Sequence, residues 1–165
     1  MTDLCDALSG FMTRLLGPGA LLSLVRLSGG ANMESWSFAW GVDGGMAGYV
    51  LRRAPSAAYM ADRPFGHGDE AALVQAAFAA GVRAPEVVGV LAEGDGLGTG
   101  YVMRRVAGEV SPAKILADPP PSLLDDLGRE LAPLSDARPR HPLNISRMVG
   151  SVRDAMAGGA ARMAA

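Results

Sequence analysis

The sequence lacks several features that would point to particular classes of protein. Cys5 is the single cysteine among 165 residues, so no intrachain disulfide can form, and a reducing compartment is the simplest setting. No basic run is present and the formal net charge is −2, which gives no indication of a nucleic-acid or anionic-membrane partner. No apolar stretch approaches the roughly 18 residues that a membrane-spanning helix needs, and residues 1–3 lack the basic segment of a signal peptide. We therefore expect a cytoplasmic protein that binds neither nucleic acid nor membrane.

The composition is that of a folded domain. Hydrophobic residues make up 49% of the chain and charged residues 19%, which favours a globular protein over a disordered one. The length fits one ordinary domain, or one small lobe with part of another.

Periodicity and turn residues predict an α+β fold. We expect a helix that ends before residues 17–19, strands at 21–27, 36–40 and 46–53, an irregular loop at 55–68, a helix at 69–80 with Asp69 as its cap, and strands at 86–91 and 100–105. The short connections favour one meander-like antiparallel sheet with the second helix packed across it. After Gly108 the pattern changes to a proline-rich break at 118–121 and two apolar helical stripes, at 123–134 and 145–156.

A glycine-containing turn between two predicted strands is the first candidate site. It consists of Ser28, Gly29, Gly30, Ala31 and Asn32. Glycine allows close approach of the backbone to a phosphate, and successive N–H groups in such a turn can bind an anion. The alternative is a hairpin turn that binds nothing.

Two arginines on the third predicted strand form the second candidate. Alternation places Val50 and Arg52 on one face, and Arg53 on the other. A cation on a strand beneath a glycine turn can reach the phosphates of a nucleotide, and arginine binds phosphate bidentately. The alternative is a pair of solvated arginines at the end of a strand.

Glu70, in the first turn of the following helix, is the third candidate, because its carboxylate can pair with Arg52 and hold it. Gln75 is a weaker substitute partner, and a solvated glutamate at a helix N-terminus is the alternative.

The fourth candidate is the apolar strand and joint at residues 101–108. Backbone groups at such a joint can read the edge of an adenine without side chains, and Met103 would line the back of the base pocket.

Taken together, these stretches resemble the aminoglycoside phosphotransferase family and its choline- and hydroxyacid-kinase-like relatives. The matching segments are 27–30, 49–53, 81–85 and 101–108, and 127–132 looks like the start of a large lobe, so the resemblance covers about residues 4–134. It implies a kinase-like small lobe at 1–106, with a five-stranded antiparallel sheet and one packed helix, preceded by a helix. A hinge and the first helices of an incomplete large lobe would follow at 107–165.

The resemblance also implies roles for individual residues. Ser28 to Asn32 would cover the phosphates of ATP or GTP, Arg52 would contact them, and Glu70 would orient Arg52. The C=O of Arg104 and the N–H of Val106 would meet the base. The terminal phosphate would pass to an alcohol group of a small molecule.

The catalytic residues of such relatives are missing from this sequence. Relatives carry His-Gly-Asp with an Asn five residues beyond the Asp, and then a metal-binding Asp. Here His67-Gly68-Asp69 precedes a small-lobe helix and is followed at that spacing by Val74, so we interpret it as a loop and a helix cap. Magnesium is expected only through residues absent from this chain.

Three interpretations follow. The chain is a catalytically incomplete piece of a longer kinase, or a pseudokinase-like module that binds a nucleotide or a protein without catalysis, or a small α+β interaction domain whose glycine turns bind nothing. In the first case, the apolar stripes of the large-lobe helices would be exposed and would favour self-association.

Overall fold

The computed structural model describes residues 2–28, 33–54, 56–60, 65–109 and 111–136. Along the chain the elements are α1 (Thr2–Leu16), β1 (Ala20–Arg26), β2 (Glu34–Val42), β3 (Gly45–Ala54), the 3-10 turn η1 (Ala57–Met60), α2 (His67–Ala79), β4 (Val87–Val90), the 3-10 turn η2 (Glu93–Asp95), β5 (Thr99–Arg104), α3 (Pro112–Ala117) and α4 (Leu123–Asp136). This is the α+β composition that the sequence predicts.

The strands form one five-stranded antiparallel sheet in the order β1-β2-β3-β5-β4. The prediction of a meander is wrong at one place, because β5 and not β4 pairs with β3. Residues 100–102 of β5 are buried, whereas Val90 of the shorter β4 is 45% exposed. A strand that is buried on both faces is stabilised most in the interior of a sheet. After β3 the chain passes through α2 and forms β4 at the edge of the sheet. The next strand, β5, then enters between β3 and β4.

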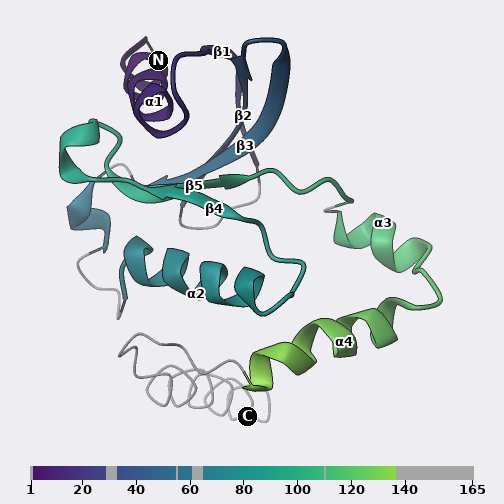
Figure 1. Cartoon of the computed structure of the whole chain (residues 1–165). Coiled ribbons are helices and arrows are strands. Elements are labelled where there is room, and N and C mark those ends of the chain that lie inside the picture. Colours follow the sequence, from purple (N-terminus) through teal and green to yellow (C-terminus); the bar gives the residue numbers. More distant parts are fainter. Residues whose placement is uncertain (1, 29–32, 55, 61–64, 110, 137–165) are drawn as a thin grey trace, which may run out of the picture.

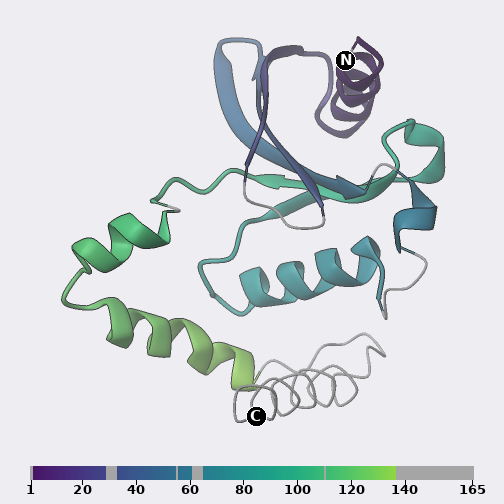
Figure 2. The same ribbon diagram turned by 180° about the vertical axis from the view of Figure 1, so that it is seen from behind.

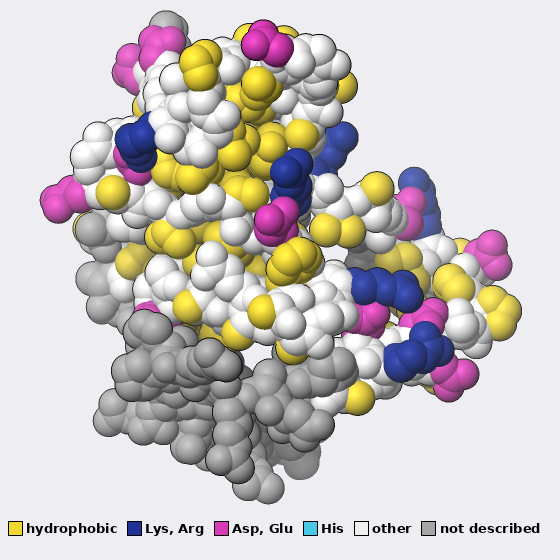
Figure 3. Space-filling view, viewed as in Figure 1, with side chains coloured by type: hydrophobic (Ala, Val, Ile, Leu, Met, Phe, Trp, Pro, Cys, Tyr) yellow, Lys and Arg dark blue, Asp and Glu magenta, His cyan; other side chains and the backbone are white. Residues whose placement is uncertain are grey.

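Helices lie on both faces of this sheet. Figure 1 shows α1 on one side and α2 on the other, and Figure 2 shows the same layers from behind. The larger apolar core lies on the α1 face and consists of Leu8, Phe11, Met12, Phe38, Trp40, Tyr49, Leu51, Leu97 and Val102. Hydrophobic side chains gather where α1 meets the sheet in Figure 3. Burial of each large side chain contributes about 1.5–3 kcal/mol, so this layer holds β2, β3 and β5 in place.

The helix α2 begins two residues earlier than predicted. Gly66 is its N-cap, and the carboxylate of Asp69 accepts the N–H of Gly66 at 3.0 Å. Asp69 is therefore not the N-cap residue, but it satisfies the same end of the helix from the third helical position. Gly81, with a φ of +85°, follows the C-terminal end as predicted.

The chain leaves β5 toward α3 and α4, which lie beside the sheet layers in Figure 1. The helix α3 was not expected from the sequence, although Ser111 caps it by accepting the N–H of Lys114, and Pro112 occupies its first turn. The predicted helix at 123–134 is confirmed as α4. Glu130 of α4 accepts the N–H of Arg83 at 2.7 Å and pairs with its Nε at 3.0 Å, which ties α4 to the loop after α2.

Some apolar surface stays open on these last helices. Leu116, Leu124 and Leu127 are 75%, 81% and 51% exposed. Leu124 and Leu127 belong to the first apolar stripe predicted from the sequence, while the second predicted stripe, at 145–156, lies outside the described residues. None of the described helices combines the length and the hydropathy needed to cross a bilayer.

The contact between β3 and β5 at Gly100 predicts a measurable sensitivity. A Cβ at Gly100 would clash with the carbonyl oxygen of Arg52 and lie 2.8 Å from the Cα of Arg53. Both atoms belong to the backbone of β3, so the two strands would have to separate. We expect Gly100→Ala to lower the free energy of unfolding by about 1–3 kcal/mol in urea denaturation.

Gly10 provides the matched control for this substitution. It lies within α1, where an added Cβ meets no atom within 4 Å. Gly10→Ala should raise the free energy of unfolding by about 0.5–1 kcal/mol, because alanine favours a helix interior. Equal effects of the two substitutions would contradict the close packing at Gly100.

Candidate functional site

Arg52 projects from β3 onto the face of the sheet against which α2 packs. Its cross-strand neighbours are Ser35 on β2 and Tyr101 on β5, and the N–H of Leu27 donates to the C=O of Ser35 at 2.8 Å. Directly opposed residues share one face of an antiparallel sheet. The side chains of Leu27, Ser35, Arg52 and Tyr101 therefore form one row, at the end of β1 that leads into the glycine turn.

Glu70 of α2 is the ion-pair partner of Arg52. The Nε of Arg52 donates to the Oε1 of Glu70 at 3.0 Å, and the two side chains are 30% and 31% exposed. Gln75, the weaker candidate partner, is exposed one turn further along. Partial burial strengthens the Coulomb attraction relative to a fully solvated pair. The pairing expected from the sequence is present, and it ties β3 to α2.

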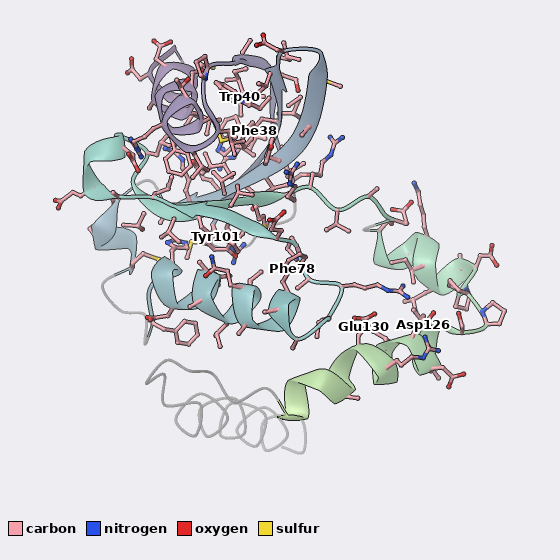
Figure 4. The ribbon with its side chains drawn as sticks, in the orientation of Figure 1. Phe38, Trp40, Phe78, Tyr101, Asp126 and Glu130 are labelled. Atoms are coloured by element: carbon pink, nitrogen blue, oxygen red, sulfur yellow. The ribbon has the colours of Figure 1, made fainter. Side chains whose placement is uncertain are left out.

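Tyr101 lies between the sheet and α2 (Figure 4), and it is the cross-strand neighbour of Arg52. It is 2% exposed. Burial raises the pKa of its phenol to about 12; the charge of Glu70 and a hydrogen bond with Glu70 add to the rise, while Arg52 opposes it. The phenol is therefore protonated at neutral pH, and a protonated phenol is a donor that suits the carboxylate beside it.

The next row on this face is mostly apolar. Val50 lies opposite Met103 on β5 and opposite Ser37 on β2, and Ser37 lies opposite Val25 on β1. Met103 also packs against the small cluster of Ala71, Val87 and Tyr101 beneath α2. The structure therefore brings the predicted residues Val50, Arg52, Glu70 and Met103 to one face, with an apolar row next to a cationic one. Such a face suits a ligand with a flat ring and an anionic tail.

The predicted backbone contacts lie where the chain leaves β5. The N–H of Arg104 donates to the C=O of Glu86 at 2.8 Å, on the side of β4. The N–H and C=O of one strand residue point to the same side, so the C=O of Arg104 points away from β3. Val106, two residues on, is 61% exposed beyond the end of β5.

The glycine turn is described only at its two ends. Ser28 is exposed, and Gly29, Gly30, Ala31 and Asn32 lie outside the described residues. The bond between Leu27 and Ser35 closes the turn at its base. This places the described ends of the turn next to the row that contains Arg52.

Arg53 differs from its neighbour Arg52 in what it contacts. Its guanidinium pairs with Glu34 at 3.0 Å and donates to the C=O of Leu97 at 3.0 Å, and its side chain is 15% exposed. Glu34 also pairs with Arg26 of β1 at 3.3 Å. Arg53 therefore holds the strand ends together on the opposite face, and Arg52 is the arginine of this pair that faces α2.

His67-Gly68-Asp69 forms the first turn of α2. His67 is 3% exposed, with its Nδ1 3.1 Å from the Oγ1 of Thr99. The segment packs a helix end against β5, so it is the first helical turn rather than the predicted loop, and Asp69 satisfies the end of the helix without being its N-cap.

Two further residues of this face, Tyr101 and Arg105, were not predicted from the sequence as site residues. Both share the alternation of Met103 along β5 and its extension, and the N–H of Arg105 donates to the C=O of Gly48 at 3.0 Å. Extending the period of two from Met103 would have found both of them.

One hollow on the surface of the described residues lies outside this site. A surface hollow of about 420 Å³ is lined by residues of the α1–β1 turn and the β2–β3 hairpin, at the opposite end of β1 and β2 from the glycine turn. Within the described ranges, no three His, Cys, Asp or Glu side chains gather in a way that could hold a metal ion.

The fold and the site define a class of protein. An open five-stranded antiparallel sheet, a helix packed across it, and an ion pair between the third strand and that helix make up a kinase-like small lobe. A model of the phosphotransferase enzyme family matches residues 23–157, more than half of the chain. The chain belongs to this family, and the resemblance noted from the sequence is confirmed. Searches of curated proteins and of solved structures found no match.

The buried phenol of Tyr101 gives a prediction on pH. Its folded pKa of about 12 lies above the ordinary 10.0, so its contribution to stability is complete below about pH 10 and is lost as the pH rises through about 12. In an ultraviolet titration, the folded protein should show one late-ionising tyrosine, which Tyr101→Phe should remove. The same substitution should flatten the fall in unfolding free energy over this range.

A late ionisation that persists in Tyr101→Phe would place the shifted phenol on another of the three tyrosines and contradict this assignment.

Proposed function

We propose that this chain is the nucleotide-binding lobe of a small-molecule kinase that transfers the terminal phosphate of ATP or GTP to an alcohol group. Membership of the phosphotransferase enzyme family supports phosphoryl transfer in general terms. The Arg52–Glu70 ion pair on the face beside the glycine turn carries the proposal of a nucleotide ligand.

The ion pair suits a phosphate contact because of which atoms it uses. Arg52 bonds to Glu70 through Nε, and the terminal nitrogens of a guanidinium are those that bind phosphate oxygens bidentately. Glu70 fixes the direction of the side chain, which reduces the entropy lost when a ligand binds. In phosphoryl transfer such groups supply positioning and charge rather than covalent chemistry.

The neighbouring apolar row supports a site for the base. Val50 and Met103 lie opposite each other next to Arg52, and the backbone of Arg104 and Val106 follows directly along the chain. A purine would lie against the two apolar side chains, with its edge toward the C=O of Arg104 and the N–H of Val106. Such an arrangement reads the base through backbone groups.

The transfer step needs residues that this sequence does not contain. After Gly108, no Asp is followed five residues later by Asn, the spacing at which relatives hold a catalytic base and a metal ligand. This absence favours a second candidate, a non-catalytic module that binds a nucleotide. The candidates differ in what the gene encodes beyond Ala165: a His-Gly-Asp segment with Asn and a metal-binding Asp supports the kinase, and their absence there supports the module.

Removal of Arg52 is the direct test of the phosphate contact. We expect the chain of 165 residues to bind ATP, and Arg52→Ala to weaken the affinity at least about tenfold, because a charge-assisted contact contributes about 1.5–3 kcal/mol. Glu70→Gln should weaken it less, since the cation remains but loses its support. Isothermal titration calorimetry measures both effects.

Arg129→Ala is the control for a lost charge. Arg129 is 66% exposed on α4, where it pairs with Asp126, and its removal should leave the affinity for ATP within about twofold. If the wild-type protein does not bind ATP, or if Arg52→Ala and Arg129→Ala weaken the affinity for ATP equally, the proposed site is wrong.

A further inference from the structure

Arg105 lies on the same face of the sheet as Arg52, on the other side of the apolar row. Its N–H bonds to the C=O of Gly48 at 3.0 Å, which places it opposite that residue. Gly48 precedes Val50 by two residues and Arg52 by four, so all three share a face. At about 3.3 Å per residue, Gly48 and Arg52 are about 13 Å apart along β3. The row of Val50 and Met103 therefore lies between two arginines.

The guanidinium of Arg105 lies flat against Gly48. Its Nε, Cζ and Nη2 atoms are 3.0, 3.2 and 3.3 Å from the position that a Cβ of Gly48 would occupy. Three nearly equal distances from one point are those of a planar group laid face-on. Glycine permits this approach because it has no side chain.

The side-chain hydrogen bond that the described residues give to this guanidinium is weak. Nη1 lies 3.4 Å from the Oγ of Ser37, at the long end for a hydrogen bond. The sheet arginines Arg26, Arg52 and Arg53 each pair with a glutamate. For Arg105, by contrast, the described part of the chain shows no carboxylate partner. Its charge is thus available to a ligand, and the residue is exposed, with its second face directed away from the sheet.

We propose that this outward face of Arg105 is a stacking platform for the purine base of the bound nucleotide, an inference that rests on the proposed function. Guanidinium groups stack on aromatic rings because the planes match and the cation is attracted to the π electrons. The phosphates then lie at Arg52 and the base lies over the apolar row against Arg105. The two arginines divide the recognition of one ligand between its two ends.

The test compares a ligand that has a base with one that lacks it. The affinities of ATP and of inorganic tripolyphosphate are measured by calorimetry for the full chain and for its Arg105→Ala, Arg105→Lys and Arg52→Ala variants. Arg105→Ala should weaken ATP about tenfold and leave tripolyphosphate within about twofold. Arg105→Lys should also weaken ATP several-fold, since it keeps the charge but loses the plane. Arg52→Ala should weaken both ligands.

Each other outcome rejects a distinct statement. Affinity for ATP that falls in Arg52→Ala but is unchanged in Arg105→Ala overturns the platform alone and leaves the proposed function standing. An equal loss of ATP and tripolyphosphate in Arg105→Ala makes Arg105 a phosphate contact and overturns stacking, as does a lysine variant equal to wild type. Absence of ATP binding by the wild-type chain rejects the proposed function and the platform together.

Discussion

The ion pair between Arg52 and Glu70 determines how the candidate site is arranged. The two residues are 18 positions apart and belong to β3 and α2. The apolar contacts of α2 are made mainly with β4 and β5, through a small cluster around Ala71 and Tyr101. The ion pair adds a directional link to the central strand. Apolar packing is not directional, whereas a hydrogen-bonded ion pair fixes both distance and orientation. The direction of the Arg52 side chain therefore depends on where α2 lies.

Alternation along β3 separates core side chains from the residues of the candidate site. Tyr49 and Leu51 lie in the core on the α1 face, while Val50 and Arg52 lie on the α2 face. A shift of one residue in register would exchange the two sets and bury a cation in the main core. The close approach of β3 and β5 at Gly100 leaves no room for a side chain. The strand β3 can therefore contribute side chains both to the core on the α1 face and to the α2 face, because its register with β5 is sterically fixed.

The face of the sheet toward α2 carries both cationic and apolar rows of side chains. Its rows carry a cation at Arg52, apolar side chains at Val50 and Met103, and a flat cation at Arg105. A lobe of this kind can position a nucleotide, and in phosphoryl transfer most of the protein's contribution is positioning and electrostatic stabilisation. Family membership agrees with this division of work.

Local sequence patterns determined α1, α2, α4, the five strands and the face that Val50 and Arg52 share, because periodicity and glycine turns act over a few residues. They also identified Glu70 as a partner for Arg52. Tertiary structure decided what local patterns cannot encode: the place of β5 between β3 and β4, the burial of Tyr101 beside the ion pair, and the position of Arg105 on Gly48. Each of these depends on contacts between segments far apart in the chain, whose relative positions are set only when the layers pack.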